Sequence, residues 1–186
     1  MSDIVIIGGP PGAGKTLLAR GLAAEFARSV HLEADQFFHF IAAGYIAPWR
    51  TESDAQNHVV NTAVARAASA YTRGGYTVIL DGINGPWFLD HLLTNLEPLP
   101  NTVHYLIVGC DPDVAIRRIQ RRPDRIYAAQ RYGSDIDETA IRFMHKQFNI
   151  ANDLPYQFLD TTDLSTEEAI IKAHALLDTG QLRLAR

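Results

Sequence analysis

The sequence predicts an α/β domain in which helices cover a parallel central sheet. Five short apolar runs, typical of buried strands, alternate along the chain with longer segments that carry apolar residues at helical spacing. A glycine-rich turn joins the first of these runs to the first helical segment. Such alternation indicates strands that run in one direction, with helices as the connections between them.

The glycine-rich turn matches a phosphate-binding loop. Residues 4–7 are apolar and β-branched, and residues 9–16 fit the pattern G-x-x-x-x-G-K-[ST]. The complete loop is Gly9, Pro10, Pro11, Gly12, Ala13, Gly14, Lys15 and Thr16. Backbone N–H groups and the dipole at a helix N-terminus together bind a compact anion such as a triphosphate. We therefore expect this loop to bind ATP.

Each residue type in the loop has a physical role. The three glycines can adopt positive φ and let the backbone approach the phosphates. The two prolines have no N–H, so the donors must come from about residues 12–16. Lys15 should reach the β- and γ-phosphates, and the Thr16 hydroxyl should ligate Mg²⁺. The alternative is a glycine-rich turn with an incidental lysine, but such a match arises by chance in about one chain of this length in a few hundred.

Apolar periodicity and helix-terminating residues define the other elements in order. We expect helices over 14–28, 36–43, 53–73 and 87–96, and strands over 30–34, 76–80, 103–108 and 157–160. Capping and helix-breaking residues mark three further helices. The first begins after its N-cap Asp111 and stops at Pro123, and the second begins at Ser134 and Asp137 and ends near Ile150. The third runs from the Ser165–Glu168 capping box to Gly180. Ligands bind beyond the carboxyl ends of such strands. Those ends carry the phosphate loop, Asp35, Asp81, Cys110 and residues 160–162.

Composition is that of an ordinary globular protein. The 186 residues are 47% hydrophobic and 20% charged, and we expect a single domain over residues 1–186. No run approaches the ~18 apolar residues of a membrane span, and no signal peptide is recognised. The single cysteine, Cys110, allows no disulfide within the chain, and we expect it to be a buried packing residue. We also expect a cytoplasmic protein without a membrane partner. The net charge of −4 makes nucleic acid an unexpected partner, and the sequence leaves the oligomeric state open.

Basic residues gather in one segment of this acidic chain. Six arginines lie within 15 positions: Arg117, Arg118, Arg121, Arg122, Arg125 and Arg131. Arg118 and Arg122 are four residues apart and share a helix face. We expect an arginine-rich lid at about 117–133, which would bring cations to a charged transition state and exclude water. A solvated basic helix is the alternative, and Arg142 and Lys146 on the next helix are expected to face solvent.

Together these features resemble the small P-loop kinases, AAA-type ATP-binding proteins with a kinase-like fold. The resemblance is to the group with chloramphenicol phosphotransferase, zeta toxins, gluconate kinase and the kinase half of polynucleotide kinase. It rests on the phosphate loop, Asp35, residues 80–82, Arg118-x-x-x-Arg122 and residues 159–168. It implies a P-loop NTPase three-layer sandwich with a five-stranded parallel sheet in the order 2-3-1-4-5. It also implies ATP with Mg²⁺, phosphoryl transfer to a hydroxyl, lid arginines on the phosphates, and Thr161 near the adenine.

Two aspartates at strand ends are the candidate catalytic carboxylates. Asp35 can accept the proton of an incoming hydroxyl, as the corresponding aspartate does in the resembling family, and a helix N-cap is the alternative. Asp81 takes the position of a Walker-B aspartate and could hold Mg²⁺ with Thr16 or orient the acceptor. A turn aspartate before Gly82 is its alternative. Gly82 replaces the glutamate that activates water in many motor ATPases, which argues against a mechanochemical ATPase.

Aromatic residues flank these aspartates and are candidates for an acceptor site. They are Phe37, Phe38, Phe40, Tyr45, Trp49, Trp87 and Phe88, with Asn84 and His39 as polar groups. Trp49 and Trp87 lie near loops and, with Asn84, Asp35 and Asp81, are the expected substrate residues. Phe37, Phe40 and Ile41 have the helical spacing of a stripe that faces the core.

The sequence therefore predicts an ATP-dependent kinase of a hydroxyl on a small molecule. Its catalytic residues would be Lys15, Asp35, Arg118 and Arg122, with ATP and Mg²⁺ as cofactors. One alternative is a polynucleotide 5′-hydroxyl kinase. The other is a non-enzymatic ATP-binding switch or toxin-related module, in which ATP is bound and barely hydrolysed.

Overall fold

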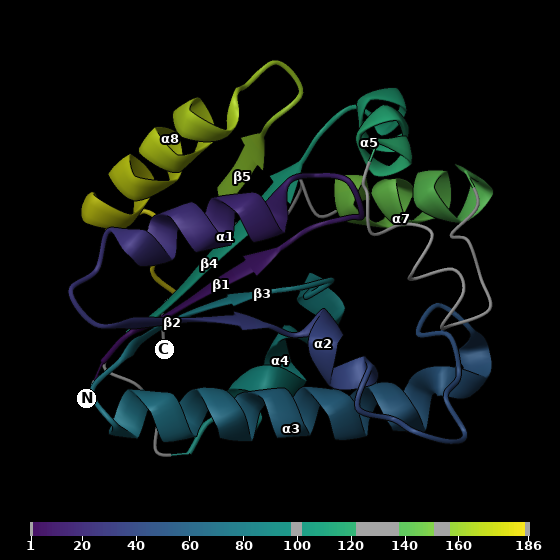
Figure 1. The fold of residues 1–186 in the computed structure, drawn as a ribbon, viewed down its shortest axis with the longest axis horizontal. Coiled ribbons are helices and arrows are strands. Elements are labelled where there is room, and N and C mark those ends of the chain that lie inside the picture. The colour runs from purple at the N-terminus through teal and green to yellow at the C-terminus, as the bar shows by residue number, and fades with distance from the viewer. Residues whose placement is uncertain (1, 98–101, 122–137, 151–156, 185–186) are drawn as a thin grey trace.

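The chain folds as the predicted three-layer sandwich (Figure 1). The computed structural model describes residues 2–97, 102–121, 138–150 and 157–184. The strands are β1 (Ile4–Gly8), β2 (Ser29–Glu33), β3 (Thr77–Asp81), β4 (Val103–Gly109) and β5 (Gln157–Asp160). The helices are α1 (Lys15–Ala24), α2 (Asp35–Phe38), the 3₁₀ helix η1 (Thr51–Ser53), α3 (Asp54–Arg73), α4 (Pro86–Thr94), α5 (Pro112–Gln120), α7 (Glu138–Ile150) and α8 (Thr166–Asp178).

The sheet has the predicted order β2-β3-β1-β4-β5, and each described pairing is parallel. Ile6 of β1 pairs with Leu80 on one side and with Tyr105 on the other. Helices α1 and α8 cover one face, and α3 and α4 cover the other (Figure 1). Because the strands are parallel, all their carboxyl ends meet at one edge, where the loops that follow β1 to β5 lie together.

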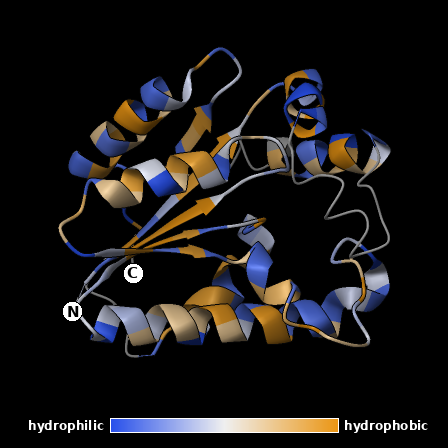
Figure 2. Cartoon of the chain, in the orientation of Figure 1, coloured by the Kyte–Doolittle hydropathy of each residue, from blue (hydrophilic) through white to orange (hydrophobic). Residues whose placement is uncertain are grey.

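Residues of β1 alternate between two hydrophobic cores. Val5 and Ile7 belong to the cluster under α1 and α8, whereas Ile4 and Ile6 belong to the cluster over α3 and α4. This two-sided burial accounts for the unbroken apolar run in the sequence. Figure 2 shows the same division, with hydrophobic strands between helices that are hydrophobic inside and hydrophilic outside. The described part of the chain contains no helix of the length and apolarity needed to cross a membrane.

Two predicted helices are shorter in the structure. The helix expected over 14–28 ends at Ala24, and the one expected over 36–43 spans only Asp35–Phe38. After Phe38 the N–H groups of His39, Phe40 and Ile41 bond to carbonyls three residues earlier, so the chain continues as tight turns. Phe40 is therefore 74% exposed, and the prediction that it faces the core is wrong, while Phe37 and Ile41 pack on the core as expected.

Neighbouring leucines of α1 provide a matched test of this packing. Leu18 is 2% exposed and Leu17 is 55% exposed. We expect Leu18→Ala to lower the free energy of unfolding by about 2–5 kcal/mol because it leaves a cavity between α1 and the sheet. Leu17→Ala should change it by less than about 0.5 kcal/mol. Urea unfolding followed by circular dichroism measures both values, and equal losses would contradict the packing of α1 through Leu18.

Candidate active site

The phosphate loop lies between β1 and the N-terminus of α1, at the carboxyl edge of the sheet (Figure 1). Gly12 and Gly14 have φ values of 78° and 90°, in the left-handed region that the loop was expected to need. A Cβ on Gly12 would lie 2.7 Å from the Ala115 carbonyl oxygen, so this glycine also lets α5 pack directly against the loop. The loop is thus held open at the helix terminus, where its N–H groups can meet an anion.

Four consecutive carbonyl groups of this loop accept hydrogen bonds from side chains, one of which belongs to the loop itself. The donors are Lys15 Nζ to Pro10 (2.9 Å), His145 Nε2 to Pro11 (2.9 Å), Cys110 Sγ to Gly12 (3.7 Å) and Thr161 Oγ1 to Ala13 (3.0 Å). They come from α1, from α7 and from the ends of β4 and β5, which are far apart in sequence. The Ala13 N–H bonds back to Pro10 O at 3.4 Å, and the other N–H groups of the loop can turn to an anion while these carbonyl groups stay satisfied.

None of these four donors was predicted for this role. His145 is buried, and burial is the main cause that lowers its pKa, while the backbone carbonyls of Pro11 and Cys110 raise it. A neutral imidazole still donates through Nε2–H, and a carbonyl can only accept. Burial likewise raises the pKa of the Cys110 thiol, so Cys110 is the expected buried residue rather than a nucleophile.

Thr161 bonds to the phosphate loop through its hydroxyl. Its side chain is 4% exposed, and its hydroxyl lies 3.0 Å from both Ala13 O and Gly109 O. The hydroxyl also accepts a bond from Arg118 Nη1 at 3.1 Å. Because these bonds engage the hydroxyl, Thr161 supports the loop, and its place near the adenine stays a prediction.

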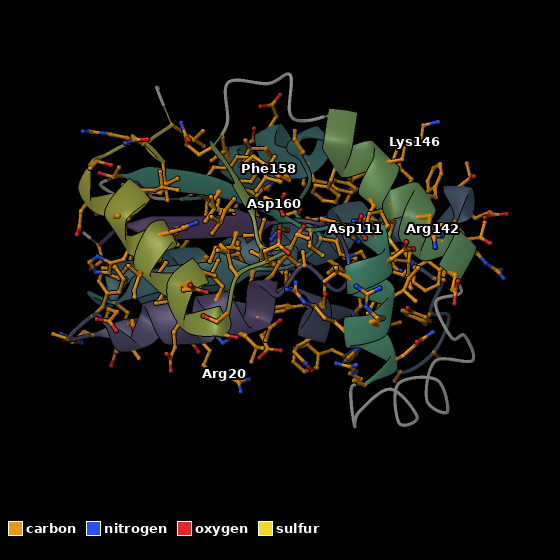
Figure 3. The ribbon with its side chains drawn as sticks, turned by 90° about the horizontal axis from the view of Figure 1, so that it is seen from above. Arg20, Asp111, Arg142, Lys146, Phe158 and Asp160 are labelled. Atoms are coloured by element: carbon orange, nitrogen blue, oxygen red, sulfur yellow. The ribbon has the colours of Figure 1, made fainter. Side chains whose placement is uncertain are left out.

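Arg118 also differs from the predicted lid residue. It lies on α5, where Nη2 donates to Thr161 O at 2.7 Å in addition to the bond to the Thr161 hydroxyl. This guanidinium therefore braces the loop after β5, and a contact with phosphate would require those bonds to break. Arg122, Arg125, Arg131 and residues 122–133 of the predicted lid lie outside the described residues. Arg142 and Lys146 are exposed on α7 as expected (Figure 3). Arg142 pairs with Asp113 of α5.

Thr16 and Asp81 meet as expected of a magnesium site. The Thr16 hydroxyl donates to Asp81 Oδ2 at 2.8 Å, and Asp81 is only 3% exposed. The hydroxyl keeps its own lone pairs, so it can ligate a cation while it donates to the carboxylate. Hydroxyl and carboxylate oxygens beside a phosphate loop suit Mg²⁺, which prefers hard oxygen ligands. A buried side chain with specific partners also excludes a simple turn aspartate.

His31 is the residue near this pair that the sequence did not single out. Its Nε2 lies 2.7 Å from Asp81 Oδ1, opposite the oxygen that Thr16 contacts. His31 lies on β2 and Asp81 on β3, and the register pairs His31 with Ile79. Because side chains alternate along a strand, His31 and Asp81 lie on the same face of the sheet. This alternation was the only feature of the sequence that could have indicated their contact.

Asp35 lies at the same edge, at the start of α2. Its side chain is exposed, yet desolvation by the surrounding protein is the main cause that raises its pKa above the ordinary 3.8. Lys15 lowers that pKa and Asp81 raises it, while the N–H of Ile83 donates to the carboxylate. Water therefore reaches the Asp35 carboxylate, which neighbouring protein atoms partly desolvate. The N-cap alternative is wrong, because Ala34 takes that position and no side-chain cap bond forms.

A close approach at Gly82 brings the loop after β3 to Asp35. A Cβ on Gly82 would lie 2.8 Å from Ala34 Cβ and 3.4 Å from Asp35 Oδ1. The same Cβ would lie 3.3 Å from Asn84 Nδ2, a buried donor without a hydrogen-bond partner. Tyr105 fixes the backbone here by donating to Asn84 O at 2.8 Å. The structure therefore brings Asn84 near Asp35, as predicted for the acceptor side.

The two tryptophans are surface residues. Trp49 is 38% exposed in the loop before η1, and Trp87 is 50% exposed at the start of α4. Trp87 also packs on Phe148 of α7, with ring centroids 4.9 Å apart. Neither has a described contact with Asp35, so their part in acceptor binding stays a prediction.

Solved structures of known proteins share this fold. An unliganded sugar kinase from Janibacter sp. HTCC2649 is 20% identical with a TM-score of 0.67, covering 96% of this chain and 95% of its own. A shikimate kinase from Acinetobacter baumannii in complex with shikimate is 19% identical with a TM-score of 0.62, covering 98% and 96%. A chain of the Pnkp1/Rnl/Hen1 RNA repair complex is 16% identical with a TM-score of 0.60, covering 82% and 45%. No curated protein matches the sequence.

The parallel sheet, the phosphate loop and the Thr16–Asp81 pair define a P-loop NTPase with a kinase-like fold. The family model described as AAA domain (AAA_33) matches residues 4–150. The chain belongs to this family. The resemblance predicted from the sequence is confirmed at this level.

The support that Thr161 gives the phosphate loop can be tested with its neighbour as control. Thr161→Val keeps the shape but removes the hydroxyl between Ala13 and Arg118. We expect about tenfold weaker ADP binding, since losing a buried hydrogen bond costs about 1–3 kcal/mol and 1.4 kcal/mol is tenfold. Thr162→Val should leave binding unchanged, because that hydroxyl bonds Asp160 and Asp111. Calorimetric titration measures both, and equal weakening would contradict the assignment.

Proposed function

We propose that this protein is an ATP-dependent kinase that transfers the γ-phosphoryl group to a hydroxyl of a small molecule. The observation that carries the proposal is Asp35, an accessible carboxylate at the carboxyl edge in the field of Lys15 and Asp81. A nucleotide switch needs no carboxylate there, and Gly82 stands where many motor ATPases have the glutamate that activates water. An acceptor hydroxyl needs a base that orients its oxygen in line with the phosphate.

The chain's residues divide the reaction between them. Asp35 takes the proton of the acceptor hydroxyl, whose oxygen forms the new bond to the γ-phosphorus. The bond from that phosphorus to the β–γ bridging oxygen breaks, ADP leaves, and Asp35 releases its proton to water. Lys15 can exchange its bond to Pro10 O for a phosphate oxygen, and the loop N–H groups stabilise the charge that develops.

The Thr16–Asp81 pair is the part of this site that suits a cation. Mg²⁺ held there would neutralise phosphate charge and align the transferred group. Thr16 would supply its hydroxyl oxygen, and Asp81, which already accepts from Thr16, would fix the direction of that hydroxyl.

A small-molecule acceptor is favoured over a nucleic-acid end by the charge of the chain. The net charge is −4, whereas binding of a polynucleotide backbone requires a basic surface. Two of the compared structures are small-molecule kinases, and one belongs to an RNA repair complex, which keeps a polynucleotide 5′-kinase as the second candidate.

An assay of ADP release separates the two candidates. Mg²⁺–ATP is supplied with pooled sugars, nucleosides, aminocyclitols or 5′-hydroxyl RNA, and the masses of the products identify the acceptor. ATP binding without acceptor-dependent ADP would contradict both.

Replacement of Asp35 tests its role as base. Asp35→Asn should reduce turnover by about 10²–10⁴-fold, the usual contribution of a general base. The affinity for ATP should change little, because the proposed role of Asp35 is on the acceptor, while the loop N–H groups and Lys15 hold the phosphates. Asp178→Asn, on exposed α8, is the matched control and should leave both values unchanged. Unchanged turnover in Asp35→Asn would end the assignment.

The raised pKa of Asp35 also predicts how activity and stability depend on pH. The acidic limb of kcat/KM should lie above 3.8, because the base must be ionised. Desolvation by the surrounding protein disfavours the ionised form in the folded state, so Asp35 costs stability as pH rises from the unfolded-state pKa to the raised folded-state pKa. Above that window the cost is complete, and Asp35→Asn should raise Tm at pH 7 but not at pH 3. A lower Tm at pH 7 would contradict this account.

A further inference from the structure

His31 contacts the buried carboxylate at the centre of the proposed magnesium site. Asp81 uses its two oxygens separately: Oδ2 accepts from Thr16 at 2.8 Å, and Oδ1 lies 2.7 Å from His31 Nε2. An ionised carboxylate only accepts hydrogen bonds, so His31 Nε2 carries the hydrogen. The carboxylate is therefore held from both sides, by β2 and by the first turn of α1.

We propose that His31 is a positioning residue for magnesium–nucleotide binding, an inference that rests on the proposed use of Mg²⁺–ATP. A carboxylate that accepts only from Thr16 could rotate about its Cβ–Cγ bond. With Oδ1 fixed by His31, the Asp81 carboxylate keeps Oδ2 toward Thr16 and holds the lone pairs of the Thr16 hydroxyl in one direction. Groups that orient a metal ligand in this way commonly contribute 10–100-fold to metal affinity.

The surroundings of His31 favour a fixed ring. Its side chain is 14% exposed on the edge strand β2, and Glu33 Oε1 lies 3.8 Å from Nδ1. That distance is too long for a hydrogen bond, so the ring is hydrogen-bonded to Asp81 while Glu33 adds a nearby negative charge. Arg20 of α1 in turn lies 3.5 Å from Glu33 Oε1 at the outer surface. Arg20 is labelled in Figure 3, where it points away from the body of the molecule. A row of polar groups thus runs from the surface to the buried aspartate.

The experiment measures how binding of a fluorescent ADP analogue depends on Mg²⁺, which requires no acceptor. In His31→Leu the Mg²⁺ concentration for half-maximal binding should rise about tenfold, while binding in EDTA changes by less than about twofold. His31→Gln retains an N–H donor of similar reach and should restore most of the Mg²⁺ response. His174→Leu, which removes a histidine paired with Asp178 on α8, is the control and should behave as the wild type.

A double-mutant cycle separates positioning from general structural support. Asp81→Asn should weaken the Mg²⁺ response further, and adding His31→Leu to it should have no additional effect, because His31 acts through Asp81. Additive losses, or an unchanged Mg²⁺ response in folded His31→Leu, would overturn the inference. If His31→Leu does not fold, His31→Asn, whose amide is too short to reach Asp81, takes its place in the cycle. The two proposals can fail separately. If His31→Leu weakens the Mg²⁺ dependence as expected but the wild type phosphorylates no acceptor, the proposed kinase function is wrong and this inference stands.

Discussion

A peptide group carries its N–H and C=O in opposite directions, and this constrains the whole carboxyl edge of the sheet. A loop that turns successive N–H groups toward an anion must turn its carbonyl groups into the protein, where each needs a donor. Residues 10–13 meet this requirement with donors from α1, α7 and the ends of β4 and β5. The elements around the loop therefore do more than cover the sheet: they fix the direction in which the loop can bind.

The same edge holds the buried lysine and the buried aspartate of the described residues. Lys15 and Asp81 are both buried there, and Asp35 stands close enough for each of them to change its pKa. Burial strengthens interactions among these groups and makes an unpartnered one costly, so the positions of Thr16 and His31 beside Asp81 are matters of stability as well as of chemistry. The packing of β2 against β3 therefore affects the residues that are proposed to bind phosphate and Mg²⁺.

Local patterns were sufficient for much of this site. The phosphate loop is one continuous segment, and Asp35 and Asp81 follow apolar strands directly, so motif and strand ends predicted their common edge. The sheet order came from the family resemblance. The contacts of His31 and His145 could not be predicted, because they join residues 50 and 134 positions apart whose meeting depends on side-chain packing. Helical spacing likewise could not show that α2 ends after Phe38 or that Arg118 turns to Thr161.

Cys110 gives this protein a natural reporter of loop movement. It is the single cysteine of the chain, it is 8% exposed, and its thiol rests against Gly12 O. Because the sulfur is buried against the loop, a thiol reagent reaches it when the loop moves away. Burial also raises the pKa of the thiol, which keeps it protonated and unreactive until then. The labelling rate therefore counts openings, as amide hydrogen exchange does for backbone groups. Alkylation followed by mass spectrometry, without any added dye or substitution, would measure the rate at which the loop opens and how much a bound ligand slows that opening.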